Sequence, residues 1–167
     1  QATGSDYTPG SLTLKITNNT GVTVSRFSID YEVWILNNAD RASSANFSYS
    51  SDNSSYTNVA SLNTTTTAAA DGSPSWASSD KSATIYGLNI ADGASFYIRW
   101  SSDDVSGSGS RDEIAIDDIV LKVNGPVSTT QNGDWDLDAT WESGSVPAST
   151  DDVIIAHNND VDDTRSC

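Results

Sequence analysis

The sequence has very few of the residues on which catalysis, disulfide bonding and metal binding by soft ligands depend. Its 167 residues include one cysteine, one histidine and no methionine. Because the only cysteine is Cys167, at the last position, no intrachain disulfide and no cysteine-rich metal site can form. His157 alone cannot build a multi-histidine metal centre, and no Gly-x-Ser-x-Gly nucleophile motif accompanies it. We therefore expect a protein that is not an enzyme.

Positive charge is also scarce. Eight Lys and Arg residues stand against 23 Asp and Glu residues, which gives a formal net charge of −15. Such a surface repels phosphate, so we expect no nucleic-acid partner and no binding to anionic membranes. No transmembrane run or signal peptide is present, so we expect no direct membrane insertion. Because the chain opens at Gln1 without methionine, we expect a processed start, as in a secreted protein or a fragment of one.

The sequence also lacks the 3.6-residue apolar period of amphipathic helices, and short stretches of alternating apolar and polar residues take its place. Phe27, Ile29, Tyr31, Val33 and Ile35 share one parity, which indicates a strand long enough to cross a whole sheet. The parity of Trp34 is opposite, so this side chain lies either in a bulge or on the outer surface. Other alternating stretches lie at residues 12–17, 47–49, 83–86, 95–100 and 113–121. The pattern predicts an all-β fold, a jelly-roll β-sandwich over residues 1–124.

A compositional change near residue 124 marks a second segment, residues 125–167, whose only basic residue is Arg165. We expect this segment to be a short C-terminal β-rich extension. The segment contains the motifs Gly133-x-Trp135 and Trp141-x-x-Gly144, followed by Pro147 and by residues 151–155. Together these motifs resemble the opening of β-solenoid segments in proteins exported by the type IX secretion system of Bacteroidota. A solenoid needs several coils to bury its apolar face, so residues 125–167 should form a cap or a fragment.

Residues 107–121 set a glycine-rich acidic loop directly against an apolar strand. Ile114 and Ile116 share one face, and the pair Asp117 and Asp118 then interrupts the apolar pattern. Neighbouring side chains of a strand point to opposite faces, so we expect one of these two carboxylates to point inward. A carboxylate in that position needs a cation, an arginine or several N–H donors to offset its desolvation.

The motif Gly-x-Gly-x-Arg-Asp-Glu-Ile-Ala-Ile-Asp-Asp-Ile at residues 107–119 resembles the closing strand of MAM domains and of MAM-like jelly rolls in secreted bacterial proteins. MAM domains typically carry paired cysteines, and residues 1–124 contain none, so the resemblance supports a laminin-G-like β-sandwich more strongly than membership of that family. It extends to residues 29–34, 47–50 and 96–100. It implies a secreted or cell-surface module that works in cell adhesion or glycan attachment.

Calcium is the metal that suits this composition, because Ca²⁺ takes six to eight hard oxygen ligands from carboxylates and carbonyls. The candidate ligands are Asp112, Glu113, Asp117 and Asp118, followed by Asp103 and Asp104. Arginine pairing is an equal alternative, in which Arg111 and Arg99 neutralise these carboxylates by bidentate hydrogen bonds. The sequence leaves both possibilities open.

Exposed aromatic side chains are the candidate ligand contacts, because sugar rings stack on aromatic faces while polar neighbours bond their hydroxyls. The candidates are Trp34, Trp76, Tyr97 and Trp100. We therefore expect a non-catalytic, calcium-stabilised module whose partner is a polysaccharide, a surface glycan or another cell-surface protein. The alternatives are an accessory domain of a polysaccharide-degrading enzyme and a purely structural spacer of a surface filament.

Overall fold

The computed structural model describes residues 10–149, 151–157, 159 and 160. The chain divides into two compact units, residues 1–121 and 122–167. The all-β fold predicted from the sequence is confirmed, because apart from strands the described residues form only two short 3-10 helices. None of those helices has the length and hydrophobicity that a membrane-spanning helix requires. Gln1 and Cys167 lie outside the described residues.

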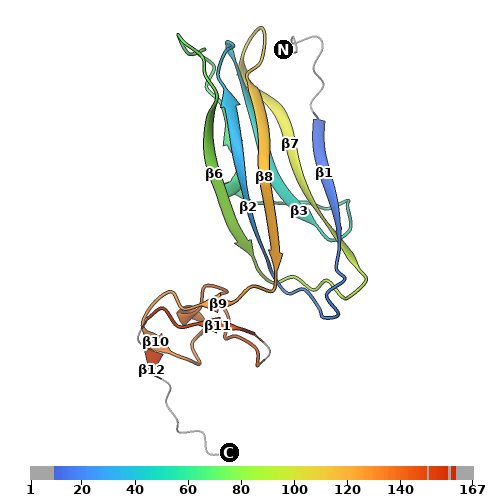
Figure 1. Cartoon of the computed structure of the whole chain (residues 1–167), viewed down its shortest axis with the longest axis vertical. Helices are drawn as coiled ribbons and strands as arrows, with labels where there is room; N and C mark the ends of the chain where they lie inside the picture. Colours follow the sequence, from blue (N-terminus) through green and yellow to red (C-terminus); the bar gives the residue numbers. More distant parts are fainter. Residues whose placement is uncertain (1–9, 150, 158, 161–167) are drawn as a thin grey trace, which may run out of the picture. The chain divides into compact units, whose positions relative to one another are not determined.

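The first unit is built from two antiparallel sheets that face each other (Figure 1). Its elements are β1 (Gly10–Thr17), β2 (Phe27–Leu36), β3 (Arg41–Ser50), β4 (Thr57–Asn58), η1 (Ala60–Leu62), β5 (Thr64–Thr65), β6 (Ala77–Ile85), β7 (Ser95–Gly107) and β8 (Glu113–Val123). One sheet has the order β1-β7-β3-β4, with β5 also paired to β3. The other sheet has the order β6-β2-β8.

The core of the sandwich lies between β2 on one side and β3 and β7 on the other. The side chains of Phe27 and Tyr31 are buried, as the alternation of β2 predicted. The ring of Phe27 stacks on Phe96 of β7 with a centroid separation of 5.3 Å, and the ring of Tyr31 meets Trp100 edge-on at 5.3 Å. Phe47 of β3 meets the same Trp100 ring at 5.4 Å. Large aromatic rings from both sheets therefore interdigitate, as in other β-sandwiches.

Strand β1 is less buried than its alternation predicted. Leu12 is 52% exposed and Leu14 is 36% exposed. The strand lies at the edge of the larger sheet, and the three strands of the smaller sheet do not fully cover it. An apolar cavity of about 420 Å³ therefore lies beside β1, with Leu12, Trp100 and Ile116 in its lining.

Strand β8 contains an irregularity that corrects the expectation of an inward-pointing carboxylate. Asp118 has a φ of +49°, and both Asp117 and Asp118 are exposed. Before this point the even-numbered Ile116 is partly covered. After it the partly covered residues are the odd-numbered Leu121 and Val123. A left-handed residue with a change of facing parity is typical of a β-bulge. The bulge turns both carboxylates to solvent, so neither needs a buried partner.

Strands also form within residues 63–82, a segment whose sequence shows no alternating apolar pattern. Strand β5 lies within the segment, and β6 begins at Ala77 rather than at Ala83. The first residues of β6 are polar and exposed, so their strand conformation comes from pairing with β2 along its whole length. Such pairing leaves no signal in the hydrophobic pattern of β6 itself.

The second unit contains short parallel strand pairs and a buried tryptophan. Strand β9 (Val127–Ser128) pairs in parallel with β11 (Val153–Ile154), and β10 (Gly133–Asp134) pairs in parallel with β12 (Asn159–Asp160). A 3-10 helix, η2 (Asp138–Thr140), lies between β10 and β11. Trp141 is 2% exposed, its ring meets Trp135 at 4.7 Å, and its Nε1 donates to the Trp135 carbonyl at 3.0 Å. A Cβ at Gly133 would lie 2.6 Å from Thr140 Oγ1, which explains the glycine of the Gly-x-Trp motif.

Candidate functional site

The carboxylates predicted to bind calcium lie at three separate places on β7 and β8. Asp103 and Asp104 lie in the second half of β7, Asp112 and Glu113 lie where β8 begins, and Asp117 and Asp118 form the bulge. Among the described residues, no group of three or more His, Cys, Asp or Glu side chains is arranged to hold a metal ion.

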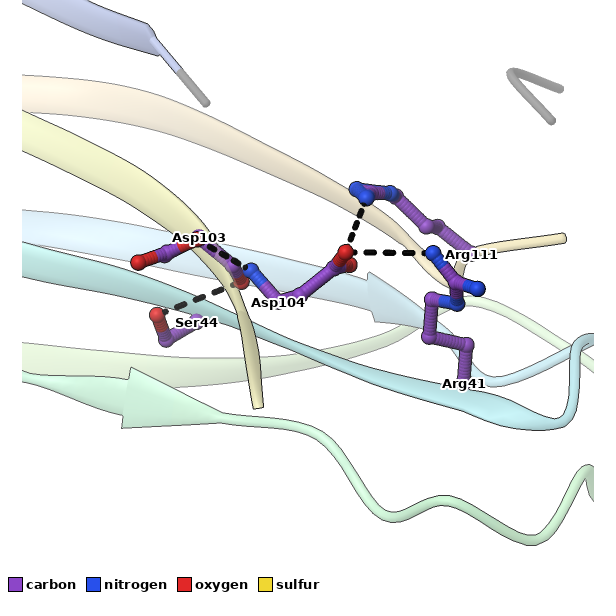
Figure 2. Close-up of polar contacts among 5 residues, drawn as sticks. All are labelled: Arg41, Ser44, Asp103, Asp104 and Arg111. Atoms are coloured by element: carbon purple, nitrogen blue, oxygen red, sulfur yellow. Dashed lines mark hydrogen bonds and ion pairs between the residues drawn. The ribbon is translucent and has the colours of Figure 1, made fainter. Parts of the chain in front are cut away.

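Asp104 is neutralised by two arginines (Figure 2). Arg41 of β3 donates from Nη1 to Asp104 Oδ2 at 3.1 Å, and Arg111 donates from Nη2 to the same oxygen. The Arg111 side chain is 7% exposed and that of Asp104 is 40% exposed, so the pairing is partly shielded from water. One carboxylate oxygen thus joins β3, β7 and the loop that leads into β8.

The neighbouring carboxylates bond backbone groups. Asp112 is 7% exposed, and its Oδ1 accepts a hydrogen bond from the Ala39 backbone N–H at 3.1 Å. Asp103 Oδ1 accepts from the backbone N–H of Asp104 at 2.8 Å, and Ser44 lies next to Asp103 (Figure 2). Two guanidinium groups at Asp104 would repel a divalent cation, so this arrangement favours the arginine-paired alternative over calcium.

Arg99 has no part in that pairing. Its guanidinium lies over the ring of Tyr56, 3.6 Å from the centroid, and its Nε donates to Thr13 Oγ1 at 2.9 Å. Arg111 alone of the two predicted arginines therefore neutralises a candidate carboxylate, and Arg41 is a partner that the sequence analysis missed. Arg41 is far from Asp104 in sequence, and only the pairing of β3 with β7 brings the two together.

Gly107 fixes the chain beside these ion pairs. Its φ is +86°, and a Cβ at this position would lie 2.2 Å from the Asp40 carbonyl oxygen. The same oxygen accepts a hydrogen bond from the Ser108 N–H at 3.2 Å. The first glycine of the 107–119 motif is therefore required by a close backbone approach, which only glycine permits.

The four predicted ligand-binding aromatics are in different environments. Trp100 is 3% exposed within the core and offers no open ring face, so we leave it out of any binding surface. Tyr97 is half-buried on the outer face of the larger sheet, where its Cα partner is Lys15. Trp76 is 47% exposed, immediately before β6. Trp34 is half-buried, and its alternation with buried neighbours places it on the outer face of the smaller sheet.

Trp34 belongs to a polar surface that we call the Trp34 face, the outer face of β2 and β6. Its members are Asp30, Glu32 and Trp34 of β2 and their Cα partners Ser82, Asp80 and Ser78 of β6. Trp34 Nε1 donates to Glu32 Oε2 at 2.9 Å, and Ser82 Oγ donates to Asp30 Oδ1 at 2.6 Å. Intramolecular hydrogen bonds therefore orient the indole and the carboxylates of Glu32 and Asp30.

Trp76 lies close in sequence to the residues of β6 that form the Trp34 face. Ser78 is the Cα partner of Trp34, and Trp76 precedes Ser78 by two residues. The paired part of β6 begins at Ala77, opposite Ile35, so Trp76 lies one residue beyond the pairing at the end of β6 that is nearest to Trp34. Both tryptophans were candidates from the sequence, but the pairing of β2 with the first residues of β6 was not visible in it.

His157 in the second unit makes a local contact. Its Nδ1 lies 3.1 Å from the Thr129 carbonyl oxygen and 3.2 Å from the Thr129 hydroxyl. This contact joins His157 to the residue that follows β9.

No protein-family model matches this chain, and no curated protein matches it in sequence.

Proposed function

We propose that this chain is a non-catalytic carbohydrate-binding module of a secreted or cell-surface protein, and that the Trp34 face together with Trp76 binds the glycan. The observation that carries the proposal is the β2–β6 register, which sets Trp34 opposite Ser78 beside carboxylates and hydroxyls, with the exposed Trp76 one residue before β6 begins.

The chemistry of this surface suits a sugar chain. Pyranose rings present apolar C–H faces that stack on indole rings, and their hydroxyls donate hydrogen bonds to carboxylates such as those of Glu32 and Asp80. The bond from Trp34 to Glu32 holds the indole in place before the ligand arrives. Binding then costs less side-chain entropy than it would for a freely rotating tryptophan.

Other features support the same context. The sandwich architecture agrees with the MAM-like resemblance of residues 107–119, and the parallel pairs β9–β11 and β10–β12 are the kind of pairing that a solenoid coil makes. We propose a MAM-like module followed by the entry to a type IX secretion-associated solenoid. The net charge of −15 fits a partner without phosphate.

Affinity electrophoresis against a panel of neutral polysaccharides tests the proposal. We expect at least one polysaccharide to retard the chain, and Trp34→Ala or Trp76→Ala to weaken that binding about thirtyfold, the loss of ~2 kcal/mol typical of a central aromatic contact. Tyr97→Ala removes an aromatic from the opposite sheet and serves as the matched control. It should bind like the wild type, provided that each variant keeps the wild-type melting temperature.

Two results would contradict the proposal. If no polysaccharide retards the folded chain, the structural spacer becomes the better interpretation. If the chain itself cleaves a glycan, the assignment as a non-catalytic module is wrong.

A further inference from the structure

A second cavity lies at one end of the sandwich, apart from the Trp34 face. It has a volume of about 400 Å³ and lies between the turn that joins β3 to β4 and the connection from β6 to β7. We call it the end pocket. Tyr49, Ser51, Ser55, Thr57, Asn89 and Phe96 are among the residues that line it. None of its lining residues carries a charge.

The first wall of the end pocket is held rigid by side-chain to backbone hydrogen bonds. Ser50 Oγ accepts hydrogen bonds from the N–H groups of Asp52 and Asn53 at 3.1 and 3.0 Å. Asp52 Oδ1 accepts from the N–H groups of Ser54 and Ser55, both at 2.8 Å. The backbone N–H groups of Ser55 and Ser54 lower the pKa of Asp52 well below its usual range, so this turn stays intact at physiological pH.

The second wall is fixed by backbone pairing. Val24 and Ile90 exchange two hydrogen bonds, of 2.9 and 3.1 Å, and the Leu88 N–H donates to the Ser25 carbonyl at 2.8 Å. Both walls are therefore in place before any ligand binds. A preformed cavity avoids the entropy that ordering flexible loops would cost.

The groups that line the pocket determine the kind of ligand. Five polar side chains of the lining have no hydrogen-bond partner among the described residues. They are the hydroxyls of Tyr49, Ser51, Ser55 and Thr57 and the side-chain amide of Asn89. These groups can donate as well as accept, and the partly exposed side chain of Leu88 supplies an apolar surface. An uncharged molecule with several hydroxyls and apolar C–H groups matches this combination, whereas a charged ligand would find no counter-charge.

We propose that the end pocket is a second carbohydrate site, which takes one or two neutral sugar rings at the end of a glycan chain. Its volume lies near the lower limit of ligand pockets, ~300–1,000 Å³. The Trp34 face would bind the middle of a chain, and the end pocket would bind its terminus. The inference adds a site to the proposed function and rests on different residues.

A titration with neutral hexoses and their disaccharides, followed in ¹H–¹⁵N spectra of the full chain, tests this proposal. We expect shifts for residues 50–57 and 87–90, and a several-fold weaker affinity in Asn89→Ala and in Tyr49→Phe. Tyr49→Phe keeps the ring that packs edge-on against Phe27 at 6.0 Å, so the fold is preserved. Asn58→Ala is the matched control, because Asn58 is exposed next to Thr57 but does not line the pocket.

The outcomes separate this inference from the proposed function. The inference is overturned if no small sugar shifts the pocket residues, or if both pocket variants bind as the wild type does, while polysaccharide retention through Trp34 persists. If Trp34→Ala abolishes the binding of small sugars, the two sites are one and the inference is wrong. If neither small sugars nor polysaccharides bind, both proposals fail.

Discussion

The replacement of Gly107 by alanine tests whether the close approach of the loop to β3 holds the ion-paired end of the sandwich together. Three costs add. A left-handed backbone at a residue other than glycine costs ~1 kcal/mol. The new methyl group, 2.2 Å from the Asp40 carbonyl oxygen, forces a backbone shift that costs ~1–3 kcal/mol. Loss of the Ser108–Asp40 hydrogen bond adds ~1 kcal/mol.

We therefore expect Gly107→Ala to lower the free energy of unfolding by about 3–5 kcal/mol, a large share of the ~5–15 kcal/mol that stabilises a typical domain. Gly109→Ala is a sharp control. Gly109 has a φ of +90°, but a Cβ there would meet no atom within 4 Å, so only the backbone cost of ~1 kcal/mol applies. Urea denaturation with linear extrapolation measures both values. Equal losses in the two variants would refute the contact with Asp40 as the cause.

Three further predictions concern charge, calcium and pH. Asp104→Asn should lower the free energy of unfolding by ~1–2 kcal/mol, because it removes the carboxylate that Arg41 and the buried Arg111 share, whereas Asp103→Asn, at an exposed position, should have little effect. Neither EDTA nor added calcium should move the melting temperature, and a rise with calcium would restore the calcium-stabilised alternative, since a ligand at ~100 times its Kd adds ~2.7 kcal/mol. Burial raises the pKa of the Tyr31 hydroxyl above its usual 10.0, and in the folded state this hydroxyl donates to the Leu62 carbonyl oxygen at 2.8 Å. The folded state therefore keeps the Tyr31 proton more tightly than the unfolded state does, and stability should fall as the pH rises above about 10, with a smaller fall in Tyr31→Phe.

The larger elements of the first unit could be predicted because their own side chains carry the signal. The alternation of Phe27, Ile29 and Tyr31 in β2 located both the strand and its buried face, and the opposite parity of Trp34 left its outer position as one of two options. Strand β6 could not be predicted in full, because its first residues are polar on both faces and take their conformation from β2. Strand β1 was predicted, but its exposure depends on which strands cover it.

The site was less accessible to sequence reasoning, because its members are joined by sheet register and not by spacing along the chain. Trp34 and Trp76 were both named as candidates, yet only the pairing of β2 with β6 shows that the chain next to Trp76 runs alongside Trp34. Asp104 was likewise a named candidate, whereas its partner Arg41 comes from another strand. The end pocket is formed by two turns whose serine, threonine and asparagine residues read as ordinary loop composition.

The bulge in β8 also bears on how copies of this module behave when they are crowded together. Within the described residues β8 is a free edge of its sheet, and Ile119 and Val120 on it are 37% and 44% exposed. A flat edge strand with exposed apolar side chains can pair with a strand from another molecule, which is a common route to aggregation. In β8 the left-handed Asp118 interrupts the row of unpaired backbone N–H and C=O groups along this edge. The adjacent negative charges of Asp117 and Asp118 would also repel the same two residues of a second copy that paired edge to edge. The bulge and the two charges of Asp117 and Asp118 are therefore expected to disfavour edge-to-edge pairing of β8 between neighbouring modules.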